Sequence, residues 1–432
     1  MSGVDIISDT TGKAIVESIK ALGLRINADK RVYGFHIDSA DSNPSTRVRY
    51  LLDAVGMTSA KMNFSAGTFD YGSWADAFFM PRPCMLKYDG TVDYYLNEND
   101  YTKKADGTAS DIANADYGGN AMMEWGDGTN LIWWKIVPDK GNDKSASIYI
   151  ANYKADDDFV CYNHIDKDGN VKSHFYTAIY NGSLDSSNRL RSISGQTVMK
   201  SKTATQEMSY ANANGSGWDI ETYVDRMLIS FLLILISKST NSQSCFGEGM
   251  SNNEWQETLL LQTGTMNTKG LFCGESTGKF GVKVFGMENF WGNQWRRTAG
   301  LMLANGITKA KLIPPYNTDG SGYKTISSVA PSGTSGGFIK DIIFTKDGFA
   351  PHVASGSEST YYCDGLWYNN EITAFALFGG ILINGRHCGS LYVDLNNAPS
   401  NANWNIGASV PIIMEQCIMH PIFLAPWQKL TR

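Results

Sequence analysis

Acidic and amide side chains alternate in the segment HIDKDGN, residues 164–170, at a spacing that could bind a calcium ion. Asp166, Asp168 and Asn170 offer oxygen ligands at every second position around Gly169, as in calcium-binding loops. The twelve-residue frame of such a loop ends in a bidentate carboxylate, and this segment has none. We therefore expect a hairpin turn here and no bound metal.

Other side chains capable of chemistry are scattered. His164 and His174 could meet across the hairpin, but without further ligands they predict a satisfied surface pair rather than a zinc site. The glycine-rich stretch 332–337 lacks the lysine of a phosphate-binding loop. The seven cysteines show no CxxC spacing and are odd in number, which indicates reduced or buried thiols. Nothing here predicts an enzyme or a cofactor.

A tract near the C-terminus, residues 361–410, has an unusual composition. It is rich in Tyr, Phe, Ile, Leu, Gly, Asn and Ser, has no lysine, and contains Arg386 as its one permanent cation. Aromatic anchors on an adaptable Gly/Asn/Ser backbone are typical of a recognition surface. A buried β core with polar turns would have the same composition, and the two interpretations stand about even.

The aromatic segment FWGNQWRR, residues 290–297, has a similar ambiguity. Trp291 and Trp295, followed by Arg296 and Arg297, could form a platform for a sugar. Their spacing also suits core packing with an indole N–H bonded to backbone, which we favour.

The overall amino-acid composition is typical of a globular chain with weakly charged surfaces. Of 432 residues, 42% are apolar and only 19% are charged, and the net charge is −6 without a basic tract. A nucleic-acid partner is therefore not expected. The first 30 residues carry Asp and Lys within their apolar run, unlike a signal peptide. The longest apolar stretch, residues 227–236, is half of what a membrane span needs, so it predicts a buried helix and no membrane insertion.

The order of expected elements is mixed rather than alternating, which predicts an α+β fold. We expect a helix over 10–23 that serves oligomerisation or attachment, then a small β-rich domain over 31–115 that includes a short helix at 47–56. A third region, 116–432, contains aromatic strands and a helical block at 200–240.

Three stretches resemble a known family. They are residues 225–249 (DRMLISFLLILISKSTNSQSCFGEG), 280–301 (FGVKVFGMENFWGNQWRRTAGL) and 361–409, where LNNAPSNANWNIG is the most specific piece. The chain resembles the variable receptor-binding proteins of phages and prophages that are diversified by diversity-generating retroelements. The resemblance covers roughly residues 115–432 and, more loosely, 31–115. It implies a C-terminal C-type-lectin fold of the subclass similar to formylglycine-generating enzyme, with a variable face at about 368–409 and a virion-attachment region before it.

In that family, copying errors replace adenines in Asn codons. From Tyr368 to Asp394, every residue except Glu371 can arise from such replacement. The resemblance marks as variable and ligand-facing Tyr368, Thr373, Phe375, Leu377, Phe378, Ile381, Ile383, Arg386, His387, Tyr392 and Asp394. It marks as framework Trp291, Trp295, Asn384, Gly385, Asn396, Asn397, Pro399, Asn401, Trp404 and Gly407.

The alternation in SLYVDL fits that division, because Leu391, Val393 and Leu395 would face inward while Tyr392 and Asp394 face a ligand. The apolar variable positions favour a protein ligand over a sugar.

The implied function is that of a tail-fibre or tail-tip adhesin, located in the virion, that binds a host cell-surface protein or glycan. Its partners would be other phage tail proteins and copies of itself, most simply in a homotrimer. Two alternatives stay open: a structural virion component whose lectin-like domain packs against neighbours, and, less favoured, a formylglycine-generating-enzyme-like oxidase.

Overall fold

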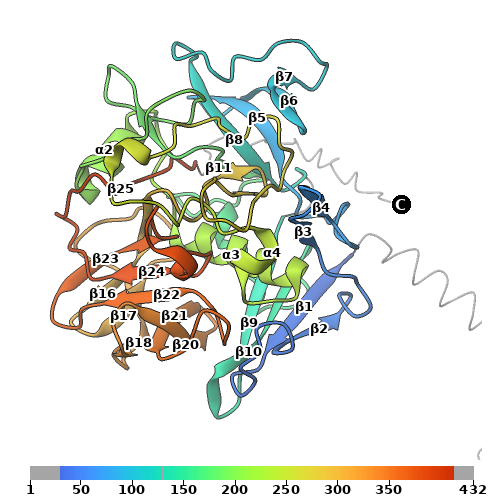
Figure 1. The fold of residues 1–432 in the computed structure, drawn as a ribbon, viewed down its shortest axis with the longest axis vertical. Helices are drawn as coiled ribbons and strands as arrows, with labels where there is room; N and C mark the ends of the chain where they lie inside the picture. The colour runs from blue at the N-terminus through green and yellow to red at the C-terminus, as the bar shows by residue number, and fades with distance from the viewer. Residues whose placement is uncertain (1–29, 129–130, 413–432) are drawn as a thin grey trace, which may run out of the picture.

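The computed structural model describes residues 30–128 and 131–412, and strands make up most of its regular structure (Figure 1). The mixed α+β class expected from the sequence is therefore confirmed. The helix predicted for residues 10–23 lies outside the described residues. The helices are α2 (Ala204–Asn212), α3 (Tyr223–Ser237) and α4 (Ser242–Phe246), with short 3-10 helices η1 (Tyr162–His164), η2 (Glu257–Leu259) and η3 (Gly385–His387).

Two antiparallel sheets come from the first half of the chain. The four-stranded sheet has the order β2-β1-β10-β9, and its strands are β1 (Val32–Ile37), β2 (Val48–Leu52), β9 (Trp133–Asp139) and β10 (Asn142–Ala151). The five-stranded sheet has the order β11-β8-β5-β6-β7, and its strands are β5 (Arg82–Lys87), β6 (Val92–Asn97), β7 (Asp100–Lys104), β8 (Gly119–Trp125) and β11 (Phe175–Ala178).

A ten-stranded curled sheet dominates the second half. Along it the order is β18-β17-β16-β23-β24-β22-β20-β21-β19, with β25 paired in parallel to β16. Its strands are β16 (Trp295–Ala304), β17 (Ile307–Ala310), β18 (Lys324–Ser327), β19 (Ser332–Gly333), β20 (Gly337–Thr345), β21 (Gly348–Ala354), β22 (Gly365–Tyr368), β23 (Thr373–Phe378), β24 (Val393–Leu395) and β25 (Ile406–Gly407). Three two-stranded sheets complete the set, formed by β3 (Lys61–Asn63) with β4 (Thr68–Asp70), β12 (Ser183–Leu184) with β13 (Leu190–Arg191), and β14 (Lys283–Val284) with β15 (Met287–Glu288).

Helix α3 lies at the centre of the molecule, between the four-stranded sheet and the ten-stranded sheet (Figure 1). The Thr222 hydroxyl accepts a hydrogen bond from the backbone N–H of Asp225 and caps its first turn, and Lys238 ends it in the left-handed conformation. All fifteen helical residues are buried, which confirms the buried helix predicted for the long apolar stretch. Across the described ranges, no helix is long and apolar enough to cross a membrane.

Strand pairing crosses the domain boundary predicted near residue 115. Strand β1 pairs with β10, and β5 pairs with β8 along its whole length. Residues 31–115 therefore share both of their large sheets with the region after 116, and they do not form a β domain of their own. Long-range strand pairing of this kind has no local sequence signal, because it depends on residues roughly 30 to 120 positions apart.

Residues 47–56, predicted as a short helix, form strand β2 and a turn instead. The side chains of Val48 and Tyr50 are buried while Arg49 between them is exposed, which is the two-residue period of a strand. Pairing with β1 and burial of Tyr50, whose hydroxyl donates to the Leu235 carbonyl at 2.8 Å, outweigh the helical spacing of the apolar residues at 48, 51, 52 and 55.

The buried ion pair of Arg297 and Glu207 joins the ten-stranded sheet to α2. The Arg297 Nε donates to Glu207 Oε2 at 2.5 Å, and its Nη2 donates to the Asn401 carbonyl at 2.8 Å. We expect Arg297→Met to lower the free energy of unfolding by about 3–5 kcal/mol, because Glu207 is left without its cation in the interior. Denaturant titration measures this. The double variant Arg297→Met/Glu207→Leu should regain most of the loss, and a single variant within about 1 kcal/mol of the parent would contradict the assignment.

Candidate functional site

Six of the eleven predicted ligand-facing residues are buried, so their predicted outward orientation is wrong. These six are Phe375, Leu377, Phe378, Ile381, Tyr392 and Asp394. Strand β23 lies between β16 and β24, and both of its faces are covered. Phe375 belongs to the hydrophobic cluster that includes Met302, Tyr316 and Val410, while Leu377 and Phe378 belong to the larger cluster around α3.

The alternation in SLYVDL, residues 390–395, also predicts an exposed side that the strand does not have. Leu391, Val393 and Leu395 are buried as expected, but Tyr392 and Asp394 on the opposite side are buried too. A two-residue period shows that a strand has two different faces, and it cannot show that one of them meets solvent. The argument that apolar contact residues favour a protein ligand loses its basis, because most of those residues are in the core.

The other five predicted residues reach the surface. Ile383 (41% exposed) and Arg386 are exposed, while Tyr368, Thr373 and His387 are half-buried. Ile383, Arg386 and His387 share the turn 383–387, whereas Thr373 begins β23 on its own. Three of the five residues therefore share one turn, whereas Tyr368 at the end of β22 donates to the Gly333 carbonyl.

That turn is held firmly. The Asn384 side-chain oxygen accepts from the backbone N–H of Ile381 at 2.9 Å, and the Gly385 carbonyl accepts from Gln243 at 3.0 Å. Arg386 pairs with Glu248 at 2.8 Å. Side chains on so constrained a turn lose little conformational entropy when a partner binds.

A partly exposed group of rings, which we call the aromatic edge, adjoins the turn. It consists of Phe338, Trp367 and His387, with buried Tyr392 beneath them. The rings of Phe338 and His387 stack with centroids 3.9 Å apart, and the Trp367 indole N–H donates to the Tyr392 hydroxyl at 2.8 Å. Tyr392 in turn packs on Trp295, with ring centroids 4.7 Å apart. The edge is thus supported from below by the predicted framework.

Glycines make this packing possible. A Cβ at Gly336 would lie 2.6 Å from the Trp367 ring, and one at Gly365 would lie 2.4 Å from the Tyr392 ring.

Sequence reasoning missed Phe338 and Trp367. Trp367 precedes the marked positions by one residue, so its aromatic type was an available signal. Nothing in the sequence connects Phe338 to His387, 49 positions further along.

The framework residues make the contacts of a scaffold. Trp291 and Trp295 are buried, as favoured from the sequence, and the Trp291 indole donates to the Gly247 carbonyl at 3.0 Å. In the loop after β24, Asn397 donates to Asp394 at 2.8 Å and accepts from Asn401.

The other framework residues also contact their neighbours. The Asn396 side-chain oxygen accepts from Asn397, and the Pro399 carbonyl accepts from the Ala204 N–H. The Trp404 ring packs edge-on against Trp255, and Gly407 lies against the Gln294 side chain.

The calcium-like segment 164–170 forms a turn, as predicted, closed by an antiparallel bridge between Ile165 and Val171. Asp166 accepts from two backbone N–H groups and pairs with Lys172 at 2.9 Å, so protein donors already occupy its carboxylate.

The predicted surface pair of histidines is wrong for His164, which is fully buried and accepts from the Ile132 N–H. Within 30–128 and 131–412, no group of three or more His, Cys, Asp or Glu side chains could hold a metal ion.

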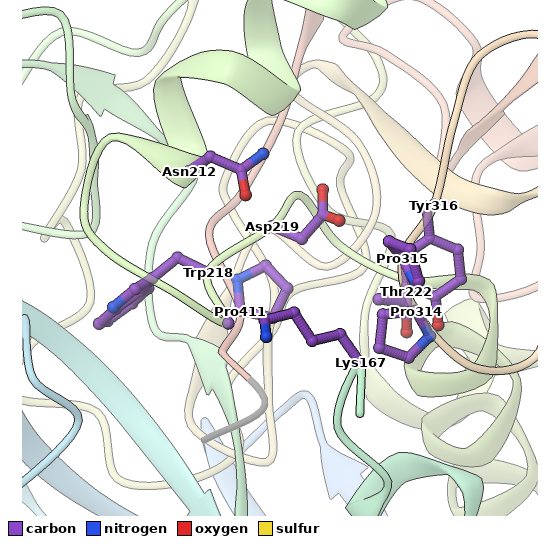
Figure 2. A pocket seen from close by; sticks show the side chains of 10 residues that line it. Lys167, Asn212, Trp218, Asp219, Thr222, Pro314, Pro315, Tyr316 and Pro411 are labelled. Atoms are coloured by element: carbon purple, nitrogen blue, oxygen red, sulfur yellow. The ribbon is translucent and has the colours of Figure 1, made fainter. Parts of the chain in front are cut away.

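A small pocket of about 60 Å³ lies at the junction of α2, the 213–222 loop and the prolines that follow β17 (Figure 2). Figure 2 shows Asp219 between Asn212 and Tyr316. Burial raises the pKa of Asp219 to about 7, and its carboxylate accepts from the Ile220 N–H. The volume suits a few water molecules rather than a substrate.

Comparison with known proteins adds no relative. No family model matches this chain, and no curated protein matches its sequence.

Paired serine substitutions test the assignment of buried and exposed positions. Phe375→Ser should lower the free energy of unfolding by about 3–5 kcal/mol, since it removes a buried ring and leaves a cavity. Ile383→Ser on the exposed turn should change it by less than about 0.5 kcal/mol. Urea titrations of both variants give the comparison. Equal costs would mean that the two side chains have similar burial.

Asp394 provides a test by pH. Burial raises its pKa from 3.8 to about 6 in the folded protein, so the folded state binds a proton more tightly than the unfolded state. This contribution to stability is present below pH 3.8 and is lost as the pH rises through about 6. Relative to Asp394→Asn, the parent should lose up to about 3 kcal/mol between pH values of about 4 and 8. Unfolding curves that stay parallel across this range would contradict the burial of Asp394.

Proposed function

We propose that the chain is a non-enzymatic receptor-binding adhesin of a phage or prophage, whose residues after about 115 adopt a C-type-lectin-like fold. One observation carries the proposal. Within the C-terminal tract, exposed Trp367 and half-buried His387 form the aromatic edge together with Phe338, and this edge adjoins the turn that carries Ile383 and Arg386. Aromatic rings and an arginine on a rigid support are the side chains that anchor most binding interfaces.

The proposed ligand is a host cell-surface protein or glycan. The ring of Trp367, 37% exposed, and the stacked pair of Phe338 and His387 offer flat apolar area to either class. The number of interchangeable positions is smaller than the sequence predicts, because substitution at the six buried positions would disturb the core. Diversity at this surface would therefore fall mainly on Ile383, Arg386 and His387.

The proposal includes a homotrimer attached to other tail proteins through the N-terminal region. Several copies on one particle would raise the avidity well above the affinity of a single site. The proposed attachment region extends to about residue 115, and its first part, residues 1–29, lies outside the described residues.

A structural virion component is the second candidate, and burial of the six predicted contact residues favours it. A domain with both sheet faces covered can serve as a packing module without any ligand. An oxidase has less support, because burial raises the pKa of Cys363 to about 12 and that of Cys388 as well, which keeps both thiols protonated.

The triple variant Trp367→Ser/Ile383→Ser/Arg386→Ser tests the adhesin. Assembled particles carrying it should adsorb to host cells at least about tenfold more slowly, since each removed anchor contributes about 1 kcal/mol or more. Adsorption kinetics on the susceptible strain provide the measurement. The matched control is Phe280→Ser/Val171→Ser/Arg189→Ser, which replaces an exposed aromatic, an exposed aliphatic and an ion-paired arginine elsewhere.

Three outcomes separate the candidates. Slower adsorption of intact particles by the first variant alone supports the adhesin. Failure of that variant to assemble, while the control assembles, supports the structural component. Unchanged adsorption would show that the aromatic edge is not the receptor site. The flanking DNA gives a separate check on diversification, through a reverse-transcriptase gene and an Asn-codon-rich copy of the C-terminal tract.

A further inference from the structure

A second cavity, which we call the basic cavity, lies where β2, β3 and the end of α3 meet. Its volume is about 520 Å³, and none of its walls belongs to the C-terminal tract. It is lined by Ser45, Thr46, Val48, Arg49, Ser59, Lys61, Ser237, Lys238, Ser239 and Cys245. The lining thus combines three cations and five hydroxyls, and it includes no carboxylate.

The three cations are not neutralised by the protein. Arg49, Lys61 and Lys238 are exposed, and no ion pair joins any of them to an acidic group within the described part of the chain. Arg49 lies opposite His36 across the β1–β2 pair, and the His36 ring bonds Asp139 instead. In a chain of net charge −6, this concentration of unpaired positive charge in a hollow attracts anions.

Two of the hydroxyls are also available. Ser237 donates to the Leu233 carbonyl and Thr46 donates to Asp41, so these groups are engaged. The hydroxyls of Ser45 and Ser59 have no hydrogen-bond partner among the described residues, and both line the cavity. They can donate to an anion or bond a hydroxyl of a ligand.

The walls are fixed by backbone bonds. The Pro44 carbonyl accepts from the Thr240 N–H at 3.0 Å, and the Ala60 N–H donates to the Ile236 carbonyl at 2.7 Å. These bonds tie the 44–46 loop and the start of β3 to the last turn of α3. The backbone segments that carry the cationic side chains are therefore fixed around one space before any ligand enters.

Lys238 has a structural role of its own. It ends α3 with φ of 53°, where glycine is more usual, and its Nζ lies 5.3 Å from the centre of the Tyr50 ring. A cation also suits the negative end of a helix. These contacts give Lys238 a structural role. Among the described residues, the side chains of Arg49 and Lys61 form no hydrogen bond, ion pair or ring contact that would give them one.

We infer that the basic cavity binds a phosphate group carried on a small hydroxylated molecule, such as a sugar phosphate. The planar fork of Arg49 and the ammonium groups of Lys61 and Lys238 match the oxygens of phosphate. The free hydroxyls of Ser45 and Ser59 match the polar remainder of the ligand. The cavity has room for both parts. This inference stands independently of the proposed function.

Calorimetric titration of the full chain tests it with three probes: inorganic phosphate, glucose 1-phosphate and glucose. Glucose 1-phosphate should bind with saturation and glucose should not. Raising the salt from about 50 to about 300 mM should weaken binding several-fold, because exposed charges are screened. The triple variant Arg49→Gln/Lys61→Gln/Lys238→Gln should lose at least about tenfold in affinity, since it removes every charged donor of the cavity.

The control variant is Lys140→Gln/Lys269→Gln/Lys279→Gln, which makes the same change of net charge at exposed lysines outside the cavity. It should bind like the parent. Equal loss in both variants would reveal a non-specific charge effect and would overturn the inference, as would absence of saturation. If inorganic phosphate binds as tightly as the ester, the cavity is a site for the free anion, and the sugar part of the inference is wrong. Thermal unfolding of each variant shows that it is folded.

Discussion

The complete burial of helix α3 is the constraint on which the rest of the structure depends. Fifteen residues without a solvent-facing side must be covered on every face, and each part of the chain supplies some of that cover. Phe35 on β1 meets Phe231, the Tyr50 hydroxyl bonds the Leu235 carbonyl, and Phe349 on β21 exchanges two hydrogen bonds with Tyr223. The strands from before residue 115 therefore cannot be separated from the later ones without exposing the helix.

The polar groups of α3 show the same dependence. Arg226 is fully buried and bonds both the Phe290 carbonyl and Glu221, while Asp225 accepts from Asn163. Ser230 donates to the Ser390 carbonyl, which lies in the C-terminal tract. Each of these groups would be costly without its partner. Consequently the tract is anchored from beneath, and its outer turns are positioned by the core rather than by one another.

The candidate surface and the basic cavity have no lining residue in common, although both lie near helix α4. The Gly385 carbonyl accepts from Gln243 of that helix, and Cys245 of the same helix lines the cavity. The aromatic edge stands on Tyr392 and Trp295, which belong to the core around α3. The cavity opens beside the C-terminal end of the same helix. Both features therefore combine a stiff interior with a few side chains that reach solvent, which is how rigid scaffolds present binding groups.

Much of the outline could be predicted from the sequence alone. The apolar run of residues 227–236 determined a buried helix, because ten residues with Ser230 as their one polar member are too short for a membrane and too apolar for a surface. The spacing of Trp291 and Trp295 indicated core, and Gly169 indicated a turn. The composition of the C-terminal tract left a recognition surface and a buried core about equally open. Tertiary structure decided between them residue by residue, by covering both faces of β23 and β24 while leaving the 383–387 turn in solvent. A strand's period reveals that it has two faces, but what covers each face is set by residues far away along the chain, such as Tyr316 and Val410, which share a hydrophobic cluster with Phe375.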